Sequence, residues 1–84
     1  MRVGAIQSIT DGVVRFYGFG EYVGDEVPDV DSVNEFTKIL GANGIANPKI
    51  VLDDGRVVWG CECWWGPEEQ IKKKIEGLTI LNAE

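Results

Sequence analysis

Apolar and polar residues alternate most regularly in the segment 47–66 (NPKIVLDDGRVVWGCECWWG), on either side of the dipeptide Asp54-Gly55. Asp-Gly is a favoured pair for a two-residue type I′ hairpin turn, because both residues accept positive φ at low cost. Such a turn places Leu52 opposite Val57, and side chains then alternate between the two faces of the hairpin. One face is almost entirely apolar and is the expected core face, with Ile50, Leu52, Val57, Trp59, Cys61, Cys63 and Trp65.

A second hairpin is indicated near the N-terminus, where residues 2–10 and 13–19 flank the turn dipeptide Asp11-Gly12. Both faces of this hairpin carry apolar side chains. Three glycines allow its strands to bend sharply, at positions Gly4, Gly18 and Gly20. We therefore expect a coiled sheet or a partly closed barrel rather than a flat sheet.

A helix is expected after an acidic loop that covers residues 20–31. Ser32 and Glu35 have the spacing of a capping box, in which each side chain accepts a hydrogen bond from a backbone N–H that the helix leaves free. Apolar residues then recur at helical spacing and predict one buried stripe, formed by Val33, Phe36, Ile39 and Leu40. Residues 41–47 end this helix.

A second short helix is marked by Pro67 at its first position and by Gly77 just after its end. Acidic residues lie in its first turn and lysines near its end, in agreement with the helix dipole. Ile71 and Ile75 are its inward pair. The sequence LTIL at residues 78–81 predicts a last strand.

These elements predict an α+β fold, in which a small antiparallel coiled sheet of about five strands (two hairpins plus a C-terminal strand) packs with two short helices. At 84 residues, the chain is expected to form a single domain, 1–84. No apolar run is long enough for a membrane span or a signal peptide, so we predict a cytoplasmic protein without a membrane partner.

The negative charge of the chain is concentrated in one segment. Residues 21–35 hold six acids and no base, whereas the rest of the chain has eight acids and eight bases, and the net charge is −6. This distribution argues against direct binding to nucleic acid, which needs a basic surface. A contact surface for a basic partner is the functional interpretation of the segment, and a solvated loop is the structural one.

The two cysteines, Cys61 and Cys63, are the second feature with potential chemistry. Two thiolates can begin a zinc site, but a structural zinc site needs four ligands, and the chain has no histidine and no third cysteine. Free cysteines also pack as small apolar side chains. Because both cysteines fall on the expected core face, we interpret them as core residues and predict no metal and no cofactor.

Catalysis finds little support in the residue types present. Without histidine, the chain lacks the usual general base near neutral pH. A carboxylate pair would need a deep pocket to shift one pKa, and a chain of this size leaves little room for one. Glu62 is the one acid within an apolar strand, and we expect it on the wetter sheet face. We therefore predict that the protein is not an enzyme.

The motif W-G-C-E-C-W-W-G, together with the N-P-K-I-x-L-D-x-G run and GFGEYVGDEVP, resembles a group of small uncharacterised proteins from bacteriophages and prophages. The matching portion covers about two-thirds of the chain. The group has no assigned activity, so the resemblance assigns no functional residue. It implies a phage accessory protein that acts inside a bacterial host.

The functional prediction is a small acidic protein-interaction module without enzymatic activity, acting as a phage-encoded modulator or inhibitor of a host defence or nucleic-acid-processing protein with a basic surface. Trp64 falls on the face opposite Trp59 and Trp65, where an exposed tryptophan would be an anchor, whereas a helix packed on that face would bury it. The expected contact residues are Glu21, Tyr22, Asp25, Glu26, Asp29, Asp31 and Trp64. The alternative is a small metal- or ligand-binding protein that uses Cys61 and Cys63. An exposed edge strand is also a place where two copies can pair into a homodimer.

Overall fold

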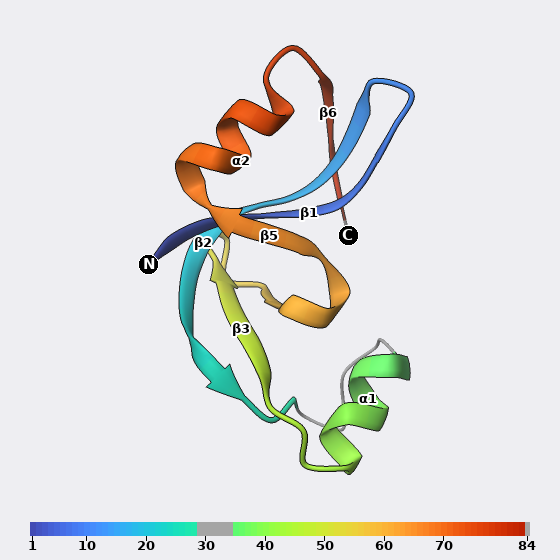
Figure 1. Cartoon of the computed structure of the whole chain (residues 1–84), viewed down its shortest axis with the longest axis vertical. Coiled ribbons are helices and arrows are strands. Elements are labelled where there is room, and N and C mark those ends of the chain that lie inside the picture. The colour runs from blue at the N-terminus through green and yellow to red at the C-terminus, as the bar shows by residue number, and fades with distance from the viewer. Residues whose placement is uncertain (29–34, 84) are drawn as a thin grey trace.

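The computed structural model describes residues 1–28 and 35–83, apart from the side chain of Phe36. It confirms the α+β fold, with six strands, two α-helices and one 3-10 turn among the described residues (Figure 1). The elements are β1 (Arg2–Thr10), β2 (Val13–Glu26), α1 (Glu35–Ala42), β3 (Asn47–Leu52), β4 (Val57–Trp59), η1 (Gly60–Glu62), β5 (Trp64–Pro67), α2 (Glu68–Ile75) and β6 (Thr79–Asn82).

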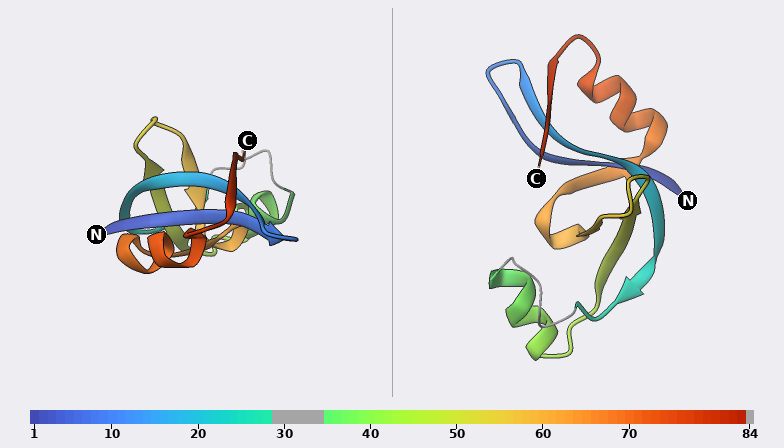
Figure 2. Two further views of the ribbon diagram at one scale, coloured as in Figure 1. Left: turned by 90° about the horizontal axis from the view of Figure 1, so that it is seen from above. Right: turned by 180° about the vertical axis from the view of Figure 1, so that it is seen from behind.

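Five strands form an antiparallel sheet in the order β4-β3-β2-β1-β5, and β6 pairs with β2 in parallel. The long strand β2 organises this sheet, because its first half lies between β1 and β6 while its second half pairs with β3. The sheet coils strongly as it passes from one half to the other (Figures 1 and 2). The expectation of a coiled sheet is therefore confirmed.

The predicted N-terminal hairpin is present with its two-residue turn. Thr10 pairs with Val13, and the turn residues Asp11 and Gly12 have φ values of 52° and 76°. Positive φ at both central residues is the signature of a type I′ turn. The dipeptide alone was enough to locate this turn.

Strand β1 is covered on both of its faces. Val3 and Ala5 point into a cluster formed with β3 and β4, whereas Ile6 points to the other face, beneath α2. The first cluster contains Val3, Ala5, Ile50, Leu52 and Val58, and the second contains Ile6, Val14, Phe16, Ile71 and Ile75. The molecule thus has two small cores that share one strand.

The register predicted for the central hairpin is wrong by one residue. Val51 pairs with Val57 and Ile50 with Val58, and the Leu52 N–H donates to the Arg56 carbonyl. The loop has three residues, and only its last, Gly55, has positive φ (92°). As a result Val58 is buried, at 6 % exposure, and Val57 lies outside, at 45 %.

The second strand of that hairpin is also shorter than predicted. It ends at Trp59, and the 3-10 turn η1 then redirects the chain so that β5 pairs with β1 instead of β3. Gly60 permits this turn, because a Cβ there would lie 2.8 Å from Pro48 Cγ and 2.9 Å from Trp65 Nε1. Between Trp59 and Trp65, side chains therefore do not alternate between the two faces of the sheet.

Three further predictions are corrected or limited by the structure. Strand β2 continues to Glu26, so most of the predicted acidic loop 20–31 is strand. Ile39, expected in a buried stripe, is 56 % exposed. The predicted capping residue Ser32 and the side chains of Val33 and Phe36 lie outside the described residues.

Candidate interaction surface

Three of the predicted acidic contact residues, Glu21, Asp25 and Glu26, lie on the second half of β2. Glu21 is 3.1 Å from the N-terminal ammonium and 3.8 Å from the Arg2 guanidinium. Glu26 is 3.4 Å from Lys49 Nζ on β3. A strand holds these carboxylates at defined positions, which a loop would not. Asp29 and Asp31, the other predicted contacts of this segment, lie outside the described residues.

Asp25 differs from its acidic neighbours in its partner. It is exposed, and its carboxylate accepts a hydrogen bond of 2.7 Å from the Tyr22 hydroxyl. No lysine or arginine in the described ranges forms an ion pair with it, so its charge is not neutralised by the protein.

Tyr22 was predicted to anchor a partner, but its ring is already engaged. It stacks on Trp65 with centroids 5.2 Å apart and packs against the first core cluster. The hydrogen bond to Asp25 raises the pKa of Tyr22, because the carboxylate stabilises the protonated hydroxyl. Tyr22 therefore orients Asp25, and one face of its ring is covered by Trp65.

Exposed apolar side chains lie beside these acids. Val23 is the extra residue of a β-bulge, because Tyr22 pairs with Ile50 while Gly24 pairs with Lys49. A bulge redirects the side chain it carries, and Val23 is exposed.

Two more apolar residues stand at the end of the β2–β3 ladder. Glu26 pairs with Asn47, so Val27 follows the last pair on one strand and Ile45 precedes it on the other, and both are exposed. We call the set Val23, Asp25, Glu26, Val27 and Ile45 the acidic–apolar end. Its apolar members were missed in the sequence, because neither the bulge nor the ladder end has a signal in the residue pattern.

Trp64, the other predicted anchor, lies elsewhere. It is 54 % exposed and on the side of β5 that faces α2, where the Lys74 ammonium lies 3.7 Å from the ring centroid. Neighbouring residues of a strand point to opposite faces, so Trp64 and the Tyr22–Trp65 stack are on different sides of the sheet. Among the described residues, the structure therefore does not bring all of the predicted contacts into one surface.

The cysteines lie near a polar contact between α1 and η1. Thr37 of α1 is fully buried, and its hydroxyl is 3.5 Å from Cys61 Sγ. It also hydrogen bonds to Glu62, whose pKa is raised by burial and partly lowered again by the bonds from Trp59 and Thr37. Burial raises the pKa of Cys63 to about 12, and its thiol donates to the Trp59 carbonyl at 3.4 Å.

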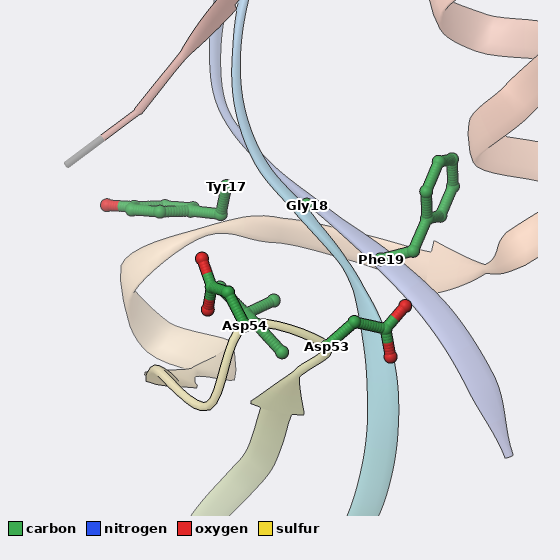
Figure 3. A pocket seen from close by; sticks show the side chains of 6 residues that line it. Tyr17, Gly18, Phe19, Asp53 and Asp54 are labelled. Carbon is green, nitrogen blue, oxygen red and sulfur yellow. The ribbon is translucent and has the colours of Figure 1, made fainter.

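A shallow pocket of about 200 Å³ lies between the middle of β2 and the loop that joins β3 to β4 (Figure 3). It is lined by Tyr17, Gly18, Phe19, Leu52, Asp53 and Asp54. Figure 3 shows the Tyr17 ring and the Asp54 carboxylate toward one side and the Phe19 ring toward the other.

Both carboxylates of this pocket are held by arginines. Asp53 accepts two bonds of 2.7 Å from Arg2, and Asp54 accepts one of 2.7 Å from Arg56 Nε. Hydrogen bonding to these arginines holds the pKa of each carboxyl below its ordinary value. Neither group is therefore a proton donor near neutral pH.

Comparison of the chain with protein-family models, with curated proteins and with solved structures finds no match. Within residues 1–28 and 35–83, no group of three or more histidine, cysteine, aspartate or glutamate side chains is arranged to hold a metal ion. Neither of the described helices is long and apolar enough to cross a membrane.

Proposed function

We propose that this protein is a small acidic interaction module without enzymatic activity, which binds a protein with a basic surface. The single observation that carries the proposal is the acidic–apolar end, where two exposed carboxylates lie next to three exposed apolar side chains at the end of the β2–β3 ladder. Apolar groups supply affinity through burial, and the surrounding charges select the partner and speed association.

Asp25 is the central residue of this proposal. Its charge has no ion-pair partner in the described part of the chain, and Tyr22 fixes its position. A basic side chain that approaches it does not have to displace an existing lysine or arginine. The same negative surface disfavours a phosphate backbone, so the expected partner is a protein and not nucleic acid.

The resemblance to phage and prophage proteins suggests where this partner is found. A phage accessory protein acts in the cytoplasm of a bacterial host, and host enzymes of defence or nucleic-acid processing carry basic grooves. We therefore propose that the module modulates or inhibits such an enzyme by covering basic surface with its acidic–apolar end.

The test is capture of partners from bacterial lysate with three baits. These are the wild-type protein, the double variant Asp25→Asn/Glu26→Gln, and the control Glu69→Gln/Glu76→Gln, which removes two exposed charges from the region of α2. A partner of the acidic–apolar end binds to the wild type and the control, loses about fivefold or more in affinity with the first variant, and dissociates as salt is added. Equal capture by all three baits, or binding that does not respond to salt, would contradict the proposal.

The alternative is a metal- or ligand-binding protein that uses Cys61 and Cys63. The thiol of Cys63 is an unfavourable ligand, because metals bind the thiolate and its pKa is about 12. Thiol titration under native conditions, with metal analysis of the purified protein, separates the two functions. Slow labelling of Cys63 before unfolding and fast labelling after it supports a packing role, whereas one bound zinc per chain or per dimer supports the alternative.

A further inference from the structure

Strand β6 is an edge of the sheet. It pairs only with β2 among the described strands, in parallel, from Val13–Thr79 to Phe16–Asn82. All four of its residues are exposed. Figures 1 and 2 show it beside the β1–β2 hairpin, with no further strand beyond it.

The hydrogen bonds of β6 show which of its backbone groups face outward. The Thr79 N–H donates to the Gly12 carbonyl at 3.0 Å, and the Ala83 N–H donates to the Phe16 carbonyl at 2.9 Å. Successive residues of a strand direct their backbone groups to alternate edges. Ile80 and Asn82 therefore present two N–H and two C=O groups at the open edge.

This edge lacks the features that usually prevent strands from pairing. Proteins protect open edges with charged side chains, proline or a covering element. Residues 77–83 contain no charge and no proline, and Ile80 and Leu81 are 50 % and 43 % exposed. The whole chain has a net charge of −6, and this uncharged edge allows two copies to approach without bringing like charges into contact.

We propose that β6 pairs antiparallel with β6 of a second copy, around a two-fold axis at Leu81. Ile80 then lies opposite the partner's Asn82, and the two such pairs form four backbone hydrogen bonds from the groups that face outward. Leu81 faces the partner's Leu81 in the closer type of pair, with Cβ atoms about 4.5–5.5 Å apart.

A second copy fits this edge better than an unrelated strand does. An isologous contact requires that a surface be complementary to itself. The uncharged strand meets this condition, because its donors and acceptors are exchanged by the two-fold rotation. A ladder of four residues buries little area, so the dimer is weak and its population depends on concentration.

Sedimentation velocity over a wide range of protein concentration tests the association. The wild type is expected to shift from monomer to dimer as concentration rises, and Leu81→Lys to stay monomeric. Ile39→Lys, which adds the same charge at an exposed site on α1, is the matched control and should behave as the wild type. A wild type that stays monomeric, or a control that abolishes the dimer as well, overturns the proposal.

Cross-linking tests the register. Leu81→Cys brings two thiols together at the axis, whereas Ile80→Cys leaves its thiols on a diagonal about 7–8 Å long, beyond disulfide reach. Under mild oxidation, Leu81→Cys is expected to form covalent dimer at least tenfold faster than Ile80→Cys or the wild type with its native thiols. Equal rates, or a faster Ile80→Cys, overturn it.

Amide hydrogen exchange gives a measurement that needs no substitution. The N–H groups of Ile80 and Asn82 should gain protection as the protein is concentrated, while that of Thr79, bonded to Gly12, should change little. Ile80 and Asn82 amides that exchange at one rate at all concentrations contradict the proposal. Asn82→Pro removes one outward donor and should weaken the dimer.

Discussion

The two α-helices of this protein are equally long, at eight residues each, and are packed in different ways. Helix α2 buries Ile71 and Ile75 against β1, whereas α1 leaves Ile39 56 % exposed. They lie at opposite ends of the long axis of the molecule (Figure 1). The comparison shows that helical spacing of apolar residues does not by itself decide which of them are buried.

Gly4 allows α2 to lie close to β1. A Cβ at Gly4 would lie 2.6 Å from Ile71 Cγ2, so α2 packs directly against the backbone of β1 at this position. For α1, the buried side chain in the described part of the helix is polar, Thr37, and it is bonded to Cys61 and Glu62. One helix is thus held by apolar packing, and the other has a polar contact with η1.

The sharpest test of this comparison makes the same substitution in both helices. Ile71→Ala removes a buried side chain and should lower the free energy of unfolding by about 2–5 kcal/mol. Ile39→Ala removes an exposed one and should change it by less than about 0.5 kcal/mol. Chemical denaturation measures both, and similar losses for the two variants would show that the helices are not packed differently.

The packing of α2 against Gly4 can also be tested by a substitution in β1. Gly4→Ala places a methyl group against Ile71 and should cost about 1–3 kcal/mol of stability by overpacking. Gly66→Ala is the control, because its added Cβ would find Ile71 Cδ1 at 3.9 Å, an ordinary contact. Thermal unfolding of the two variants should give a clearly lower midpoint for the first alone.

The polar contact of α1 can be removed without changing its volume. Thr37→Val deletes the buried hydroxyl and should destabilise the protein by about 1–2 kcal/mol, because Glu62 and Cys61 lose a partner. The same change should raise the pKa of Glu62 further, since the bond from Thr37 lowers it. Carboxyl titration by NMR measures this shift, and an unchanged Glu62 pKa would contradict the assigned bond.

The smallest effect concerns pH. The pKa of Glu62 is raised in the folded protein, so the folded state holds this proton more tightly than the unfolded one. Its contribution to stability is most favourable below the ordinary glutamate pKa and is lost as pH rises through the raised value. Glu62→Gln should remove this part of the pH profile, leaving the opposite contribution of Asp53 and Asp54, whose pKa values are lowered. Identical profiles for the variant and the wild type would show that Glu62 does not contribute.

Local sequence signals predicted the helices, strands and turns better than they predicted which of these elements pair with one another. Asp11-Gly12 located its turn, and Pro67 and Gly77 bracketed α2. Asp54-Gly55 located a turn but not its length, because a three-residue loop with only Gly55 at positive φ fits the same residues. The one extra loop residue shifts the register of the hairpin, so that Val58 is buried and Val57 is exposed.

The candidate surface was predicted only in its charged part. Asp25 and Glu26 are exposed as expected, because carboxylates are costly to bury. The apolar members could not be found, since the exposure of Val23 depends on a bulge that arises only when β2 pairs with β3. Tyr22 and Trp64 were both predicted to contact a partner, but pairing of β5 with β1 places Trp64 on the side of the sheet opposite the Tyr22–Trp65 stack.

The residues of this chain by themselves determine the α+β class, the N-terminal turn, the second helix and the location of the excess negative charge, because each depends on neighbours within a few positions. The tertiary structure decides the register of the central hairpin, the path of β5 and the exposure of each tryptophan. These depend on contacts between distant segments, such as Gly60 against Pro48 and Gly4 against Ile71. Such contacts form only in the folded, coiled sheet, so the local order of apolar and polar residues does not predict them.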